Sequence, residues 1–82
     1  MDDSALRYKA REVVLTGNIP ARRPDRIWGG PGGGAECSIC SAPVTHDQVE
    51  FEVEFVRGEE IITHHLHVDC FTAWEGECER CS

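Results

Sequence analysis

Two pairs of residues in the chain have the types and spacing of metal ligands. Cys37 and Cys40 are separated by two residues, and His67 and Cys70 repeat this spacing after 26 intervening residues. Zinc binds thiolates and imidazoles in a tetrahedral arrangement, and a tight turn at this spacing points both ligands of a pair to one side. The four side chains therefore predict one Zn²⁺ site made of three thiolates and one imidazole.

A competing set of ligands lies near the end of the chain. Cys78 and Cys81 have the same spacing, and together with the first cysteine pair they would form an all-thiolate zinc site. Zinc chemistry accepts both sets. We favour the set that contains histidine, because ligands in a structured element hold their geometry better than ligands at a terminus that frays. Cys78 and Cys81 remain as an alternative metal pair or as a dithiol.

The elements that must position the favoured ligands can be read between the two pairs. Alternating apolar and polar residues predict a strand over residues 48–55 with its apolar side chains on one face. A turn and a second apolar run predict that the chain returns as an antiparallel strand over residues 61–66. A helix then begins at the second ligand pair, and its Phe71 and Trp74 can cover the hairpin. The predicted fold class is small α+β, a zinc-stabilised finger of knuckle, hairpin and C-terminal helix.

Residues 1–35 precede this zinc-binding domain of residues 36–82. Apolar residues at helical spacing predict an amphipathic helix over residues 4–16, with Ser4 as its N-cap and Gly17 as its stop signal. Residues 19–35 contain three prolines and five glycines, so they predict an extended arm without regular structure. The glycine run of this arm lacks the strand, lysine and helix of a phosphate-binding loop, and it reads as a flexible linker.

The arm carries the residues that we consider for partner binding: Arg22, Arg23, Arg26 and Trp28. Arginine beside an aromatic residue suits a contact with another molecule. The same tryptophan could instead fold back over the finger, and we favour this second use, because the chain has only six aromatic residues with which to build a core.

Length and charge restrict the class of protein. The chain has 82 residues, enough for one small domain whose core needs an additional cross-link for stability. Five cysteines in a reducing compartment favour a bound metal over disulfides as this cross-link. The formal net charge is −7, with +2 on residues 1–35 and −9 on residues 36–82, so the zinc-binding part would repel a phosphate backbone. The chain begins with charged residues and has no long apolar run, which favours a cytoplasmic protein without a membrane span.

The order of Cys37-x2-Cys40, hairpin and His67-x2-Cys70-Phe71 resembles treble-clef zinc fingers, especially LIM-type fingers and those of poly(ADP-ribose) polymerases. The resemblance covers about 35 residues and implies zinc binding. The chain departs from this pattern at Ser41, where such knuckles commonly have glycine. It also has Glu50, Glu52 and Glu54 in the predicted strand, where a DNA-binding finger would have basic residues, so the DNA-binding role of the polymerase fingers is not carried over. The chain as a whole, including its Pro24–Pro31 run, resembles short uncharacterised bacterial proteins with this layout.

The expected function is a structural zinc-binding protein that acts as a small interaction or regulatory module and binds another protein. One alternative is a nucleic-acid-binding finger that uses the basic arm, and another is a thiol redox or metal-trafficking protein that uses the C-terminal dithiol. An enzyme is not expected, because four protein ligands would leave zinc no open position for water. The other histidines are expected in solvent or turns, and Glu50, Glu52 and Glu54 are expected to form a solvated strand face.

Overall fold

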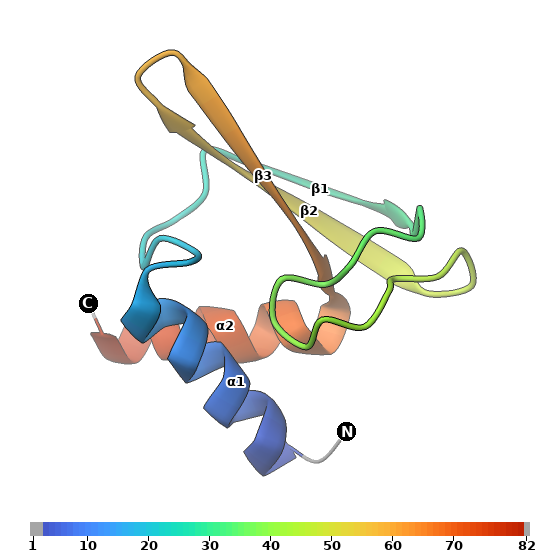
Figure 1. Ribbon diagram of the computed structural model, residues 1–82, viewed down its shortest axis with the longest axis horizontal. Coiled ribbons are helices and arrows are strands. Elements are labelled where there is room, and N and C mark those ends of the chain that lie inside the picture. The colour runs from blue at the N-terminus through green and yellow to red at the C-terminus, as the bar shows by residue number, and fades with distance from the viewer. Residues whose placement is uncertain (1–2, 82) are drawn as a thin grey trace.

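The computed structural model describes the backbone of residues 3–81 and the side chains of residues 4–78. Two helices and a three-stranded antiparallel sheet form a small α+β fold, as predicted (Figure 1). The elements in chain order are α1 (Asp3–Thr16), β1 (Arg26–Pro31), β2 (Val49–Arg57), β3 (Glu60–His67) and α2 (Val68–Cys81). Neither of these helices has the length and apolar character needed to cross a membrane.

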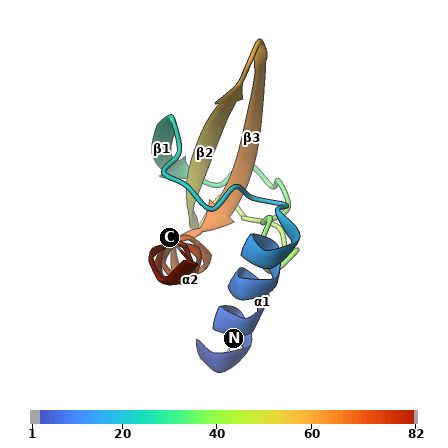
Figure 2. The ribbon, with the colours of Figure 1, turned by 90° about the vertical axis from the view of Figure 1, so that its left-hand side faces the viewer.

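The predicted hairpin is present as β2 and β3. The two strands pair in antiparallel register from Glu50 opposite His67 to Arg57 opposite Glu60. At the turn, Gly58 has a φ of 62°, a left-handed value that glycine adopts at little cost because it has no Cβ. The tip of the hairpin points away from both helices (Figures 1 and 2), so the opposite end of β3 lies at the start of α2.

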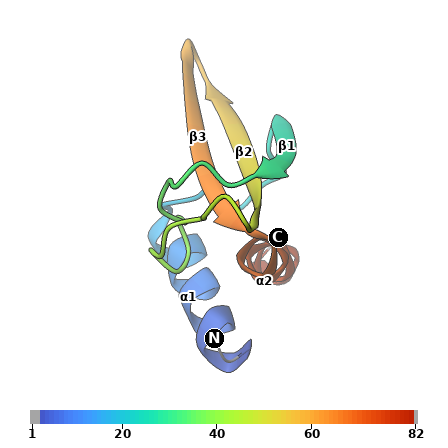
Figure 3. The same ribbon diagram turned by 90° about the vertical axis from the view of Figure 1, so that its right-hand side faces the viewer.

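The N-terminal helix begins one residue earlier than predicted, so Ser4 lies inside α1 and is not its N-cap. Its stop signal is confirmed. Gly17 has a φ of 77°, its amide donates to the carbonyl of Val14, and the amide of Asn18 donates to the carbonyl of Val13. This pattern of two bonds satisfies carbonyls that a helix end otherwise leaves unpaired. α1 packs against α2 (Figures 2 and 3).

The prediction that the arm has no regular structure is wrong. Residues 26–31 form β1, which pairs along its whole length with β2 and is an edge strand of the sheet. Proline is tolerated at the end of an edge strand, which is where Pro31 lies. Just before β1, the Asp25 carboxylate accepts a hydrogen bond of 2.7 Å from the amide of Val56, which lowers the pKa of Asp25. Backbone pairing with β2 therefore overrides the weak local strand preference of the arm.

The glycine run is also more than a flexible linker. Gly32 is buried, and its amide donates to the carbonyl of Gln48 at 2.9 Å. A Cβ at Gly32 would approach the backbone carbonyl oxygen of Thr45 at 2.2 Å and that of Val44 at 2.5 Å. The segment after β1 therefore lies directly against the segment before β2, and only glycine fits at this crossing.

We expect Gly32→Ala to destabilise the protein by about 2 kcal/mol or more, because the added methyl group forces two backbone segments apart. Thermal or urea unfolding of the zinc-loaded protein measures this change. Gly33→Ala is the matched control, since a Cβ at Gly33 meets nothing within 4 Å, and its effect should stay within about 0.5 kcal/mol. Equal stabilities of the two variants would contradict the close approach.

One core draws on both parts of the chain. Its buried side chains come from both helices, from β2 and β3, and from the segments between α1 and β2, and they are Leu6, Ala10, Val13, Val14, Ile19, Cys37, Ile39, Val44, Val53, Phe55, Leu66, Cys70 and Trp74. The prediction that Trp28 enters the core is wrong, because Trp28 is 53% exposed. In register it lies opposite Glu52, so the alternation of β1 points it outward, and Trp74 of α2 fills the core against Phe55.

Candidate metal centre

The first two candidate ligands lie on a knuckle, residues 37–40. The amide of Cys37 donates to the carbonyl of Ala42, and the amide of Ser41 donates to the carbonyl of Cys37, which closes the turn. Ser41 has a φ of 68°, a left-handed conformation that glycine adopts at less cost than serine. The amide of Ser38 donates to the carbonyl of His65 at 2.9 Å, so the knuckle is attached to the edge of β3.

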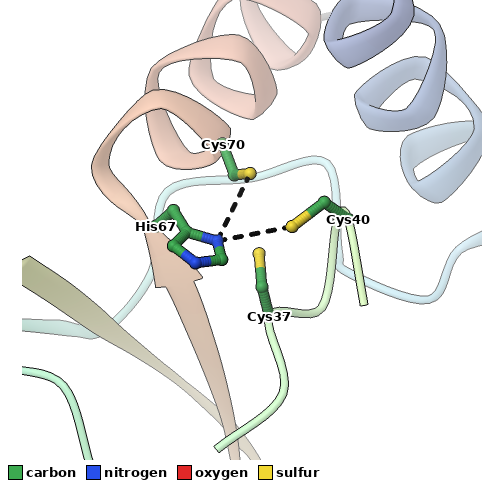
Figure 4. Close-up of side chains that lie close together, drawn as sticks. All are labelled: Cys37, Cys40, His67 and Cys70. Atoms are coloured by element: carbon green, nitrogen blue, oxygen red, sulfur yellow. Dashed lines mark hydrogen bonds between the residues drawn. The ribbon is translucent and has the colours of Figure 1, made fainter. Parts of the chain in front are cut away.

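The other two candidate ligands lie at the junction of β3 and α2. His67 is the last residue of β3, and Cys70 lies in the first turn of α2. Nδ1 of His67 is 3.3 Å from Sγ of Cys40 and 3.9 Å from Sγ of Cys70 (Figure 4). The donor atoms of Cys37, Cys40, His67 and Cys70 all lie within 4.8 Å of one another. The structure therefore brings together the four residues of the favoured set.

The imidazole of His67 is oriented for metal binding. Its Nε2 is 3.2 Å from the carbonyl oxygen of Pro43, which can only accept a hydrogen bond, so Nε2 carries the proton. In the neutral ring Nδ1 is then the unprotonated nitrogen, and this is the atom that faces the sulfurs. A ligating histidine usually donates its second nitrogen to a carbonyl or carboxylate in this way. The hydrogen bond to the Pro43 carbonyl thus fixes the orientation of the His67 ring.

The environment of the thiols favours a thiolate at Cys37. A hydrogen bond from the Cys70 thiol lowers the pKa of Cys37 to about 4, against the opposing effect of burial, and the amide of Ile39 donates to the same sulfur at 3.4 Å. The same contact with Cys37, together with burial, raises the pKa of Cys70. Metal binding releases thiol protons, so an ion bound by these sulfurs would take the place of the Cys70 proton.

The donor set fits a soft or borderline ion in a closed site. Three thiolates and one imidazole are one of the donor sets of structural zinc sites, which have four ligands. Cys37 and Cys70 are almost completely buried, and Cys40 and His67 are half-buried. The cluster can therefore hold one metal ion.

The competing set includes Cys81, whose side chain lies outside the described residues. Its other member, Cys78, is half-buried on α2 and packs against the core. The structure thus gathers His67 and Cys70 with the first cysteine pair, and the role of the C-terminal pair stays a prediction.

The basic arm is only partly available to a partner. Arg22 donates to the carboxylate of Asp25 at 3.3 Å and to the carbonyl of Val56 at 3.2 Å, and its guanidinium lies 5.1 Å from the centre of the Phe55 ring. These contacts make Arg22 a support for the fold, which spacing along the sequence could not reveal. The three other candidates for partner binding are exposed, namely Arg23, Arg26 and Trp28.

Two expectations about polar side chains need correction. His64 is not a solvent histidine: its Nδ1 lies 3.0 Å from Oγ of Ser38, and burial lowers its pKa. It therefore supports the knuckle from β3. Glu50 is not part of a solvated face, because only 6% of it is exposed. The alternation of residues in β2 correctly predicted that Glu50 lies on the side opposite the apolar residues. Whether that side is buried depends on the neighbouring strands β1 and β3, which the alternation does not reveal.

Comparisons with protein-family models, curated proteins and solved structures find no match to the chain. The resemblance to treble-clef fingers therefore stays a prediction from the order of ligands and elements.

Proposed function

We propose that the protein is a structural zinc module of treble-clef type, in which one Zn²⁺ ties the knuckle to the junction of β3 and α2. The observation that carries this proposal is the approach of three sulfurs and one imidazole nitrogen to within 4.8 Å of one another. These groups come from segments that are far apart in the sequence, so one ion would hold the whole fold together. The donor chemistry favours zinc over harder ions.

The proposed role of the ion is structural and not catalytic. A catalytic zinc keeps one position for water or substrate, whereas here four protein atoms would fill the coordination sphere. Burial of Cys37 and Cys70 supports this, since water would reach the ion only past other ligands. Because the proposed ion has no free coordination position, we place the function of the module on its surface.

We infer that this surface binds another protein through the outward side of β1. Trp28 is 53% exposed there, and large exposed aromatic residues are common anchors of protein interfaces. Arg23 and Arg26 are exposed close to it in sequence, so the partner would offer an apolar pocket beside acidic groups. Such a partner fits the basic arm better than it fits the acidic remainder of the chain.

The structure gives less support to nucleic acid as the partner. All three arginines of the arm are exposed, but Arg22 is held by Asp25 and Val56, so only Arg23 and Arg26 are offered to a phosphate backbone. The neighbouring strand β2 carries three glutamates, and their charge opposes a phosphate backbone. We expect no oligonucleotide binding tighter than about 10⁻⁴ M at physiological salt.

Trp28→Thr tests the proposed interface, because threonine preserves strand preference while it removes the aromatic anchor. We expect at least about tenfold weaker binding to the natural protein partner, with unchanged zinc content and thermal midpoint. Tyr8→Ala is the matched control: Tyr8 is 66% exposed on α1 and should not affect this binding. Partner binding that survives Trp28→Thr, or micromolar oligonucleotide binding that falls with salt, would contradict the proposal.

A further inference from the structure

The outward side of the sheet carries a second group of metal-binding side chains, which the proposed zinc centre does not use. In register, Glu52 of β2 lies between Trp28 of β1 and His65 of β3, and Glu50 is the next residue of β2 on the same side. The donor atoms of Glu50, Glu52 and His65 all lie within 4.8 Å of one another. Two carboxylates and one imidazole thus converge on one point.

The imidazole of His65 approaches both carboxylates without a hydrogen bond to either. Nδ1 of His65 is 3.2 Å from Oε2 of Glu50 and 3.6 Å from Oε1 of Glu52. Neither approach has the geometry of a hydrogen bond, because His65 Nδ1 is buried without a hydrogen-bond partner among the described residues. One imidazole nitrogen and two carboxylate oxygens, all electron-pair donors, therefore lie close together without a hydrogen bond from the nitrogen to either oxygen.

Glu50 is the independent sign that this point takes a ligand. Its side chain is 7% exposed, and its Oε1 is buried with no hydrogen-bond partner among the described residues. Burial of a carboxylate in this state is costly unless a charge or a metal compensates it. A divalent ion among the three donor atoms would offset the negative charges of both carboxylates.

We propose that Glu50, Glu52 and His65 form a second metal site, which binds a divalent transition ion. Two oxygens and one nitrogen make a harder donor set than the cysteine-rich centre, so the two sites select different ions. A hollow of about 270 Å³ opens beside the two glutamates and is lined by Trp28, Gly29, Gly30 and Pro31. Three protein ligands leave coordination positions free, and this hollow gives water or a small ligand access to them.

Mn²⁺ is the probe for this site, because it prefers oxygen and nitrogen ligands and does not displace zinc from thiolates. Zinc-loaded full-length protein is titrated with Mn²⁺, the free ion is counted by electron paramagnetic resonance, and retained zinc is measured in the same samples. We expect one Mn²⁺ per chain while the zinc content stays constant. This result is independent of the proposed partner, and constant zinc shows that the cysteine centre is not the Mn²⁺ site.

Three variants locate the ion. Glu50→Gln and Glu52→Gln should each weaken Mn²⁺ binding at least about tenfold, since even residues behind the ligands change metal affinity 10- to 100-fold. Glu52 is 40% exposed, so its variant serves if Glu50→Gln does not fold. Glu54→Gln is the matched control, because Glu54 lies on the same side of β2 outside the group and loses the same charge. Absence of Mn²⁺ binding, full affinity in the folded glutamine variants, or an equal loss in Glu54→Gln would overturn the proposal.

Discussion

Removal of zinc from the protein is expected to abolish its cooperative thermal unfolding transition. Structural zinc contributes about 10 to 16 kcal/mol of apparent binding free energy, whereas the core of so small a domain supplies about 3 to 5 kcal/mol. Cys37 and Cys70 are themselves part of that core, so loss of the ion leaves thiols crowded at its centre. Chelation followed by calorimetry and circular dichroism measures the effect.

Native mass spectrometry before chelation should show one zinc per chain, and return of zinc to the chelated protein should restore the transition. The chelator alone is excluded as the cause if a zinc-free small domain keeps its own transition under the same conditions. A metal-free protein that unfolds with the same midpoint and enthalpy as the loaded protein would contradict a structural role of the ion.

Cys70→Ser is expected to lose zinc and cooperative folding together. The change removes one of the three sulfurs of the cluster, the one at the start of α2, and a serine hydroxyl does not replace a thiolate as a zinc ligand. Zinc content should fall from about one ion per chain to near zero, because an incomplete site also loses the folding that positions its other ligands. Elemental analysis of the purified variant gives the stoichiometry.

The control makes the same chemical change further along the same helix. Cys78→Ser, alone or combined with Cys81→Ser, should keep one zinc per chain and shift the midpoint only slightly, since Cys78 is half-buried beside the core. The all-thiolate set requires the opposite pattern, with zinc lost from the double variant and retained in Cys70→Ser. The two experiments therefore separate the two sets of ligands.

The sequence alone determined those features that depend on neighbouring residues. Alternation over residues 48–55 predicted the hairpin because a strand repeats its side every two residues. Gly17 predicted the end of α1 because a helix end needs a residue that tolerates positive φ. The spacing of Cys37 with Cys40 and of His67 with Cys70 predicted the two ligand pairs, because each pair needs only a local turn or helix start.

Only the tertiary structure decided the features that depend on pairing between distant segments. The arm has little strand preference of its own, and β1 exists because β2 offers it a hydrogen-bonding edge. The register of that pairing points Trp28 outward and leaves the core to Trp74. The register of β2 with β3 brings His65 to the two glutamates, and no spacing within one strand encodes such a contact. Local patterns therefore predict elements and ligand pairs, while strand register decides which polar side chains meet.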